Sequence, residues 1–114
     1  MTTAREAFEA KKLAQKYGVI GKVAARYRQA GYQVKVESID PSAKRHFVAT
    51  RKGEKLVVRV YSRSGTVPES VVEELASSGD GKKMLVLYGA GPRTSQAFID
   101  KAKQLGVGIR RVRA

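Results

Sequence analysis

Two residues that can bind an anion lie two positions apart in a segment typical of a β-hairpin. The second arm, Lys55–Tyr61, alternates so that Arg59 and Tyr61 are expected on one side of a strand. The first arm, Arg45–Thr50, alternates too, and Lys52-Gly53-Glu54 between the arms is typical of a tight turn with a positive φ at the glycine. Arg59 and Tyr61 can therefore contact one phosphate or a stacked base.

The chain of 114 residues is strongly basic. It contains 23 Lys and Arg against 10 Asp and Glu, which gives a net charge of +13 and an isoelectric point near 10.4. Such a charge repels itself and is best tolerated when the partner is a polyanion. Nucleic acid is the leading partner and an acidic membrane surface a distant second, while a ribosome-associated basic protein has the same composition.

The basic residues form three groups along the chain. They comprise a hairpin group (Lys44, Arg45, Arg51, Lys52, Lys55, Arg59, Arg63), a helical group (Lys11, Lys12, Lys16, Lys22, Arg26, Arg28) and a tail (Arg110, Arg111, Arg113). The Gly-rich loop Gly89–Thr94 is a further candidate, because its amides and the following helix N-terminus can receive a phosphate beside Arg93. It is not a Walker loop, since no Gly-Lys-Ser/Thr follows, and an ordinary tight turn has the same pattern.

Periodicity and turn residues predict the remaining elements. We expect a helix opened by Thr3-x-x-Glu6 and ending near Gly18, a helix Ile20–Ala30 ended by Gly31, a strand Tyr32–Ile39, the hairpin, a helix opened by Thr66 as N-cap, a buried strand Met84–Tyr88, a helix Thr94–Leu105 and a strand Val107–Val112. This order predicts an α/β (α+β) domain with a mixed sheet: N-terminal helices, an antiparallel hairpin, then helix-strand-helix-strand. We expect one domain over 1–114, with an N-terminal helix at 1–18 and a core at 20–113.

The hairpin and the elements after it resemble the restriction-endonuclease-like PD-(D/E)XK superfamily, most closely its Mrr branch. The similarity covers about Gly21 to Val112 and includes Gly31-Tyr32 and the segment TSQAFIDKAKQLG. That family has an Asp on the first hairpin arm and Glu/Gln-x-Lys on the second. The matching positions here are His46, Arg59 and Tyr61, and Lys22 stands where the family often has a helical Glu.

The resemblance therefore implies a nuclease-like core whose catalytic positions are all substituted. Such a nuclease needs carboxylates to hold Mg²⁺, and an Arg at a metal position repels the ion. Arg, His and Tyr instead donate hydrogen bonds to a phosphate. We expect no catalytic residue, metal or cofactor, and a surface that binds DNA or another nucleic acid through Lys44, Arg45, His46, Arg51, Lys52, Lys55, Arg59, Tyr61, Arg63 and Arg93.

Two other functions stay open. In the first, the chain is an active metal-dependent endonuclease or junction resolvase. Its metal-binding carboxylates then lie at other positions of the sequence, for example at Glu37 or Asp40. In the second, it is a non-catalytic subunit, pairing with an active nuclease or with itself, and the apolar residues near the N-terminus form an interface. Those residues are Phe8, Tyr17, Val19 and Ile20.

Composition excludes several classes. The chain has no cysteine, so disulfides and thiolate metal sites are excluded. It has no run of 18 apolar residues and no apolar signal core at its N-terminus. We therefore expect no membrane partner and a cytoplasmic location, including association with the nucleoid.

Overall fold

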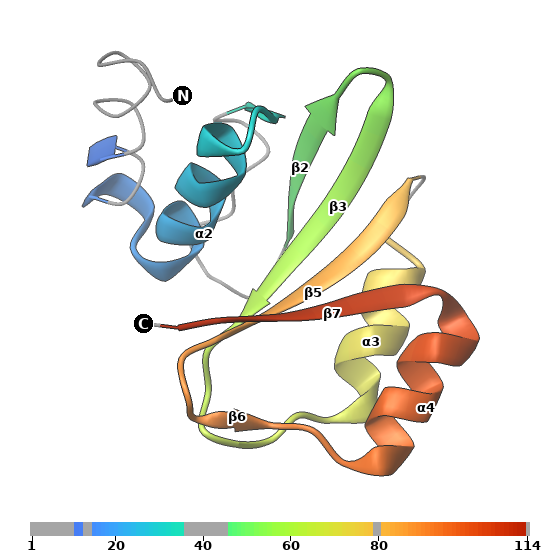
Figure 1. The fold of residues 1–114 in the computed structure, drawn as a ribbon. Helices are drawn as coiled ribbons and strands as arrows, with labels where there is room; N and C mark the ends of the chain where they lie inside the picture. The colour runs from blue at the N-terminus through green and yellow to red at the C-terminus, as the bar shows by residue number, and fades with distance from the viewer. Residues whose placement is uncertain (1–10, 13–14, 36–45, 79–80, 114) are drawn as a thin grey trace.

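The computed structural model describes residues 11–12, 15–35, 46–78 and 81–113. Its centre is a five-stranded mixed sheet with the strand order β1-β2-β3-β5-β7 (Figure 1). The strands of this sheet are β1 (Gln33–Val34), β2 (His46–Arg51), β3 (Glu54–Tyr61), β5 (Lys82–Tyr88) and β7 (Val107–Val112). The pairs β1–β2 and β2–β3 are antiparallel, whereas β3–β5 and β5–β7 are parallel.

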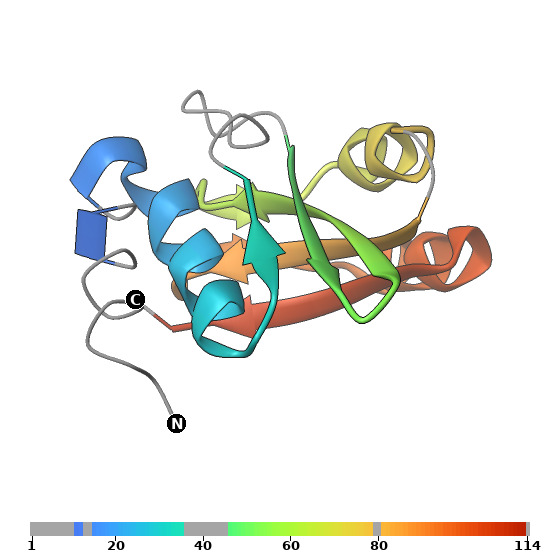
Figure 2. The same ribbon diagram turned by 90° about the horizontal axis from the view of Figure 1, so that it is seen from above.

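Helices cover both faces of the sheet, so the predicted mixed α/β architecture is confirmed. Helix α2 (Val19–Gln29) packs on one face through Ile20, Val23 and Tyr27. Helices α3 (Glu69–Ala76) and α4 (Gln96–Leu105) pack side by side on the other face (Figure 2). A Lys101–Glu73 ion pair of 3.5 Å links α4 to α3.

The hairpin has the predicted alternation. Its ladder runs from the His46–Arg59 pair to the Arg51–Glu54 pair, which leaves Lys52 and Gly53 as a two-residue turn. Their φ angles of 49° and 82° are those of a type I′ turn, whose twist matches that of the strands.

The turn glycine gives a stability prediction. A Gly53→Ala substitution forces an L-residue into the left-handed region and is expected to lower the free energy of unfolding by about 1–2 kcal/mol. The control is Lys52→Asn, because Asn tolerates a positive φ, and it is expected to leave stability unchanged or higher. Urea denaturation compares the two, and equal midpoints would contradict this turn geometry.

The C-terminus of α2 also ends as predicted, at Gly31. This glycine has a φ of 97°, its amide donates to the Arg28 carbonyl and the Tyr32 amide donates to the Tyr27 carbonyl. Together these bonds form a Schellman motif. The Tyr27 and Tyr32 rings meet edge to face at 5.4 Å, which adds the apolar contact that accompanies the motif.

The start of α3 differs from the prediction. Thr66 is not its N-cap, because Thr66 belongs to a short strand, β4 (Gly65–Thr66), paired with β6 (Pro92–Arg93). The helix begins at Glu69 after an extended Pro68. The expected strand Tyr32–Ile39 is only β1 within the described residues, and the Thr3-x-x-Glu6 capping box lies outside them.

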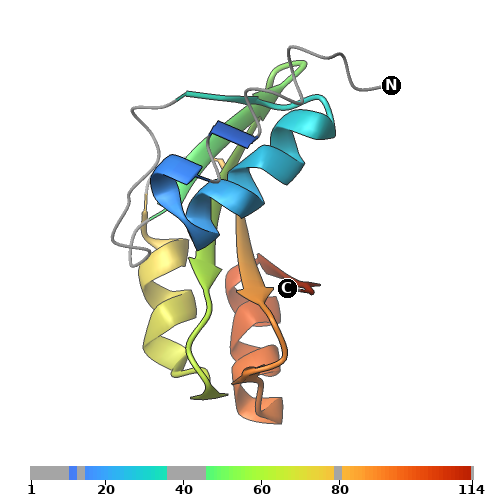
Figure 3. The same ribbon diagram turned by 90° about the vertical axis from the view of Figure 1, so that its left-hand side faces the viewer.

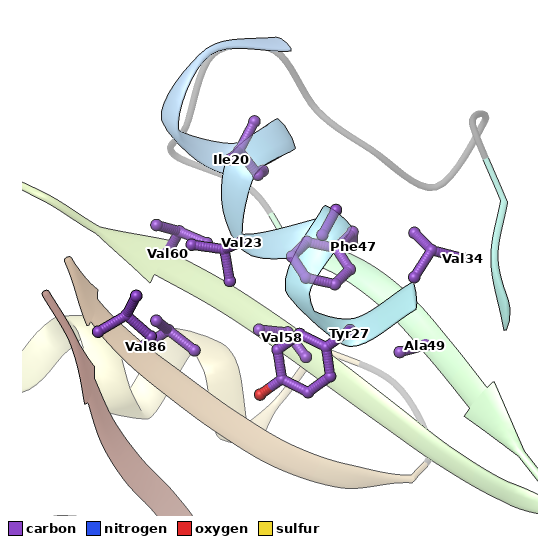
Figure 4. Close-up of a cluster of buried hydrophobic side chains, with 11 residues drawn as sticks. Ile20, Val23, Tyr27, Val34, Phe47, Ala49, Val58, Val60 and Val86 are labelled. Carbon is purple, nitrogen blue, oxygen red and sulfur yellow. The ribbon is translucent and has the colours of Figure 1, made fainter. Parts of the chain in front are cut away.

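The sheet separates two apolar clusters. On the α2 side, Phe47, Val58, Val60 and Val86 pack against Tyr27 and its neighbours on the helix (Figure 4). On the other side, α3 and α4 cover a second cluster that includes Val57, Leu85 and Phe98. Ile20 is fully buried in the first cluster, and the partly buried Tyr17 and Val19 pack against that cluster; Phe8 lies outside the described part of the chain.

Burial raises the pKa of the Tyr27 hydroxyl above its ordinary value of 10.0; Arg110 opposes the rise and Tyr32 adds to it. The unfolded chain therefore ionises this phenol at lower pH than the folded chain does. The stability it contributes is complete below about pH 10 and is lost as the pH rises through the folded pKa. We expect unfolding free energy to fall more steeply between about pH 9 and about pH 11 in the parent than in Tyr27→Phe, as urea denaturation would show. Equal slopes would contradict this.

Candidate nucleic-acid interface

His46, Arg59 and Tyr61, the three residues on which the sequence resemblance rests its substituted catalytic positions, come together on one face of the hairpin. His46 is directly opposite Arg59 in the β2–β3 ladder, and Tyr61 follows Arg59 by two residues. The burial pattern places Arg59 and Tyr61 on the α3 side of the sheet, since Val58 and Val60 face α2. All three side chains are partly buried, near the carboxyl end of β3.

Arg59 already has an acidic partner. Its Nη1 donates to Glu74 Oε2 on α3 at 2.8 Å, and its side chain is only 14% exposed, whereas that of Glu74 is 68% exposed. The Arg59 Nε is buried and lacks a hydrogen-bond partner. Arg59 therefore links α3 to the sheet, and its positive charge is partly neutralised before any phosphate approaches.

Four exposed arginines lie at the carboxyl ends of the parallel strands. We call Arg63, Arg93, Arg111 and Arg113 the carboxyl-end surface. Figure 3 shows β3 and β5 running side by side toward this end of the sheet. Ligands of open α/β sheets bind in this region, outside the carboxyl ends of the strands.

Arg111 holds this end of the sheet together. Its Nη1 donates to the Gly89 carbonyl at 2.6 Å and its Nη2 to the Pro92 carbonyl at 2.5 Å. The Gly89 amide in turn donates to the Val112 carbonyl at 2.8 Å. The loop after β5 is therefore tied to β7, and Arg113 follows directly from that junction.

The β4–β6 ladder brings the segments that carry Arg63 and Arg93 to the same end of the sheet as Arg111 and Arg113. The Gly65 amide donates to the Gly91 carbonyl at 3.1 Å and the Val67 amide to the Arg93 carbonyl at 2.8 Å. Ser64 is packed so closely on Gly91 that a Cβ there would lie 2.7 Å from its Oγ. Arg63, which precedes Ser64, thus lies near the Gly91–Arg93 segment.

The remaining predicted binding residues lie elsewhere. Arg51, Lys52 and Lys55 are exposed at the hairpin turn, roughly 20 Å along β3 from Tyr61 at about 3.3 Å per residue. Arg51 covers the Tyr32 ring at 4.3 Å and donates to the Ala30 carbonyl at 3.1 Å. Lys44 and Arg45 lie outside the described residues. The predicted set therefore falls into two regions.

Hydrogen bonds to its neighbours hold the Gly-rich loop Gly89–Thr94 in place. Two of its carbonyls accept hydrogen bonds from Arg111, and the first turn of α4 is capped by Ser95, whose Oγ accepts from the Phe98 amide at 3.1 Å. Arg93 remains exposed in this loop. The exposed Arg93 side chain is therefore the charged group that this loop offers to an anion.

Within the described ranges, no three His, Cys, Asp or Glu side chains gather in a way that would hold a metal ion. Glu37 and Asp40 fall in the segment that the structure does not describe. Lys22 is exposed on α2, the helix on the opposite face of the sheet from Arg59. Every helix of the described residues lacks the length and hydrophobicity that crossing a membrane requires.

Comparisons with known proteins add little to this geometry. No family model matches the chain, and no curated protein matches it. Among solved structures it is similar to Pyrococcus furiosus SfsA in complex with Ca²⁺, with 17% identity and a TM-score of 0.43. The match covers 57% of this chain and 40% of that one, so the chain spans less than half the length of that structure. A likeness of this size is too low to assign a family or a function.

Proposed function

We propose that this chain is a single-domain, non-catalytic nucleic-acid-binding protein, with DNA as its main ligand. The observation that supports this most directly is the carboxyl-end surface, where the segments that carry the exposed Arg63, Arg93, Arg111 and Arg113 meet at one end of the sheet. The net charge of +13 favours a polyanionic partner. The binding site lies on a nuclease-like domain. In this domain His46, Arg59 and Tyr61 occupy the positions that correspond to catalytic residues in the superfamily that the chain resembles.

The arginines bind phosphates by charge-assisted, often bidentate hydrogen bonds. Arg63, Arg93 and Arg113 make these contacts directly, while Arg111 mainly orders the loop through Gly89 and Pro92. Lys52 and Lys55 at the hairpin turn lie roughly 20 Å away, which is about six base pairs of duplex at 3.4 Å per pair. They contact a second stretch of backbone when the duplex lies along β3.

The Arg59–Glu74 pair argues for loss of catalysis. In the superfamily that the chain resembles, the position of Arg59 contributes a metal ligand, and here a cation occupies it with its own carboxylate at 2.8 Å. A divalent ion next to a guanidinium is electrostatically disfavoured. Arg59 therefore acts as a positioning residue that fixes α3, leaving phosphate binding to the exposed arginines.

The test is a set of native and denaturing gels with Mg²⁺ present. Labelled duplex, single strand and four-way junction are each titrated with the protein across a salt series. We expect shifted bands with intact strands. The ligand that binds most tightly identifies the preferred nucleic-acid structure, and the resemblance makes a four-way junction a candidate. Cut strands would instead identify an active nuclease with migrated carboxylates, and no shift at low salt would refute nucleic-acid binding.

A further inference from the structure

A pocket of about 400 Å³ opens on the α2 face of the sheet, the face opposite Arg59. It lies between the C-terminal half of α2 and the strands β3, β5 and β7. Its volume is within the range of pockets that hold small organic ligands. Neither the nuclease-like resemblance nor the carboxyl-end surface involves this pocket.

The pocket exists because α2 leaves part of the sheet uncovered. The helix packs mainly on β1, β2 and β3, so that Val86 and Val112 are buried in its cluster, whereas Met84 on β5 is only partly buried and Arg110 on β7 is exposed. Gly108 on β7 provides no side chain, and Met84 of the neighbouring strand leans over it, with Cε 3.0 Å from where a Cβ would be. The result is a shallow floor rather than a filled core.

The pocket lining offers apolar surface of the size of a planar ring. Leu56 and Met84 on the floor and Tyr32 on the wall are all only partly buried. Tyr27 extends from α2 over Val58 and completes the wall (Figure 4). Aromatic side chains stack on nucleobases regardless of base identity, and the aliphatic side chains of Leu56 and Met84 add apolar contact.

The rim of the pocket is positively charged. Arg26 on α2, Lys82 on β5 and Arg110 on β7 are exposed there, and among the described residues that line the pocket the only carboxylate is that of Glu54. Glu54 is 3.6 Å from Lys82 and is neutralised by it, which leaves Arg26 and Arg110 with a net attraction for anions. An apolar floor beneath a cationic rim matches a ligand that combines a flat ring with a phosphate.

We propose that this pocket binds one unpaired nucleotide of a single-stranded nucleic acid, an inference that rests on the proposed function. The base lies against Leu56, Met84 and Tyr32, and its phosphate faces Arg26 and Arg110. The carboxyl-end surface holds paired backbone, whereas this pocket holds an unpaired residue. The two faces together favour substrates in which duplex and single strand meet.

The test uses the Met84 methyl group as a reporter. The chain has only two methionines, so protein with ¹³C-labelled methionine methyls gives two resonances. A short oligoadenylate of about four nucleotides is expected to shift the Met84 signal. Arg110→Gln is expected to weaken this effect about fivefold, the loss of about 1 kcal/mol for one ionic contact. The matched control, Lys103→Gln, removes an exposed charge on α4 and is expected to change nothing.

The outcomes separate this proposal from the proposed function. An oligonucleotide that binds, by fluorescence anisotropy, without moving the Met84 signal would overturn the pocket assignment and leave the carboxyl-end surface standing. An equal effect from free adenosine monophosphate would overturn the single-strand assignment in favour of a free nucleotide. If the oligoadenylate shifts the Met84 signal but the protein does not bind duplex, the result would support the pocket and refute the carboxyl-end surface.

Discussion

Replacing Arg63, Arg93 and Arg113 together with Gln is expected to lower the affinity for duplex DNA about 100-fold at low salt. Each side chain is exposed on the carboxyl-end surface, and a lost phosphate contact costs about 1 kcal/mol. The slope of log K against log salt is expected to fall in magnitude by about 0.9 for each contact removed. Arg111 is left in place because it orders the loop through Gly89 and Pro92.

The matched control removes the same charge elsewhere. Lys12→Gln, Lys22→Gln and Lys103→Gln take away three exposed cations that lie outside both the carboxyl-end surface and the hairpin turn. We expect this triple variant to lose less than about tenfold, through general electrostatics alone. Fluorescence anisotropy with a labelled duplex compares the two, and equal losses would refute the placement of the site.

Placing carboxylates at the positions that the resemblance matches to catalytic residues is expected to create metal binding. In the triple variant His46→Asp, Arg59→Glu and Tyr61→Lys, two new carboxylates face each other across the β2–β3 ladder, with Glu74 close to position 59. Without metal their repulsion lowers the melting temperature. Mg²⁺ or Mn²⁺ at about 100 times its Kd would return about 2.7 kcal/mol, a rise of several degrees.

The control for this rebuilt site is the triple variant His46→Asn, Arg59→Gln and Tyr61→Phe. It removes the same charges and hydroxyl but provides no carboxylate, so its melting temperature should not respond to divalent ions. A folded carboxylate variant that also fails to respond would contradict the resemblance of these three positions to a metal site. Differential scanning fluorimetry with and without the ion provides the measurement.

The elements defined by neighbouring residues were predictable from the sequence. Alternation from Leu56 to Tyr61 separates the two faces of β3, and the structure has the same separation. Gly31 ends α2 and Gly106, in the left-handed region, ends α4, because glycine takes these positive φ angles without a Cβ clash. The start of α4 also agrees closely, with Ser95 rather than Thr94 as the first cap residue.

The features that define the candidate site depend on contacts distant in sequence. Arg59 and Glu74 are 15 residues apart, and Arg111 reaches carbonyls 19 and 22 residues away. The β4–β6 pairing likewise joins two dipeptides on separate loops, so Thr66 satisfied a local capping pattern while a tertiary contact made it a strand. Local periodicity does not encode such contacts. Nothing in the sequence around Arg111 therefore indicated that its side chain donates to the Gly-rich loop.

The central claim is that nucleic acid binds at the carboxyl ends of the parallel strands. The most direct test is to record amide resonances of ¹⁵N-labelled protein during titration with a short DNA duplex in moderate salt. The largest shift changes are expected in residues 62–66, 89–95 and 111–113, weakening as salt is raised. Changes confined to α3, α4 or the hairpin turn, or the absence of any change at low salt, would contradict it.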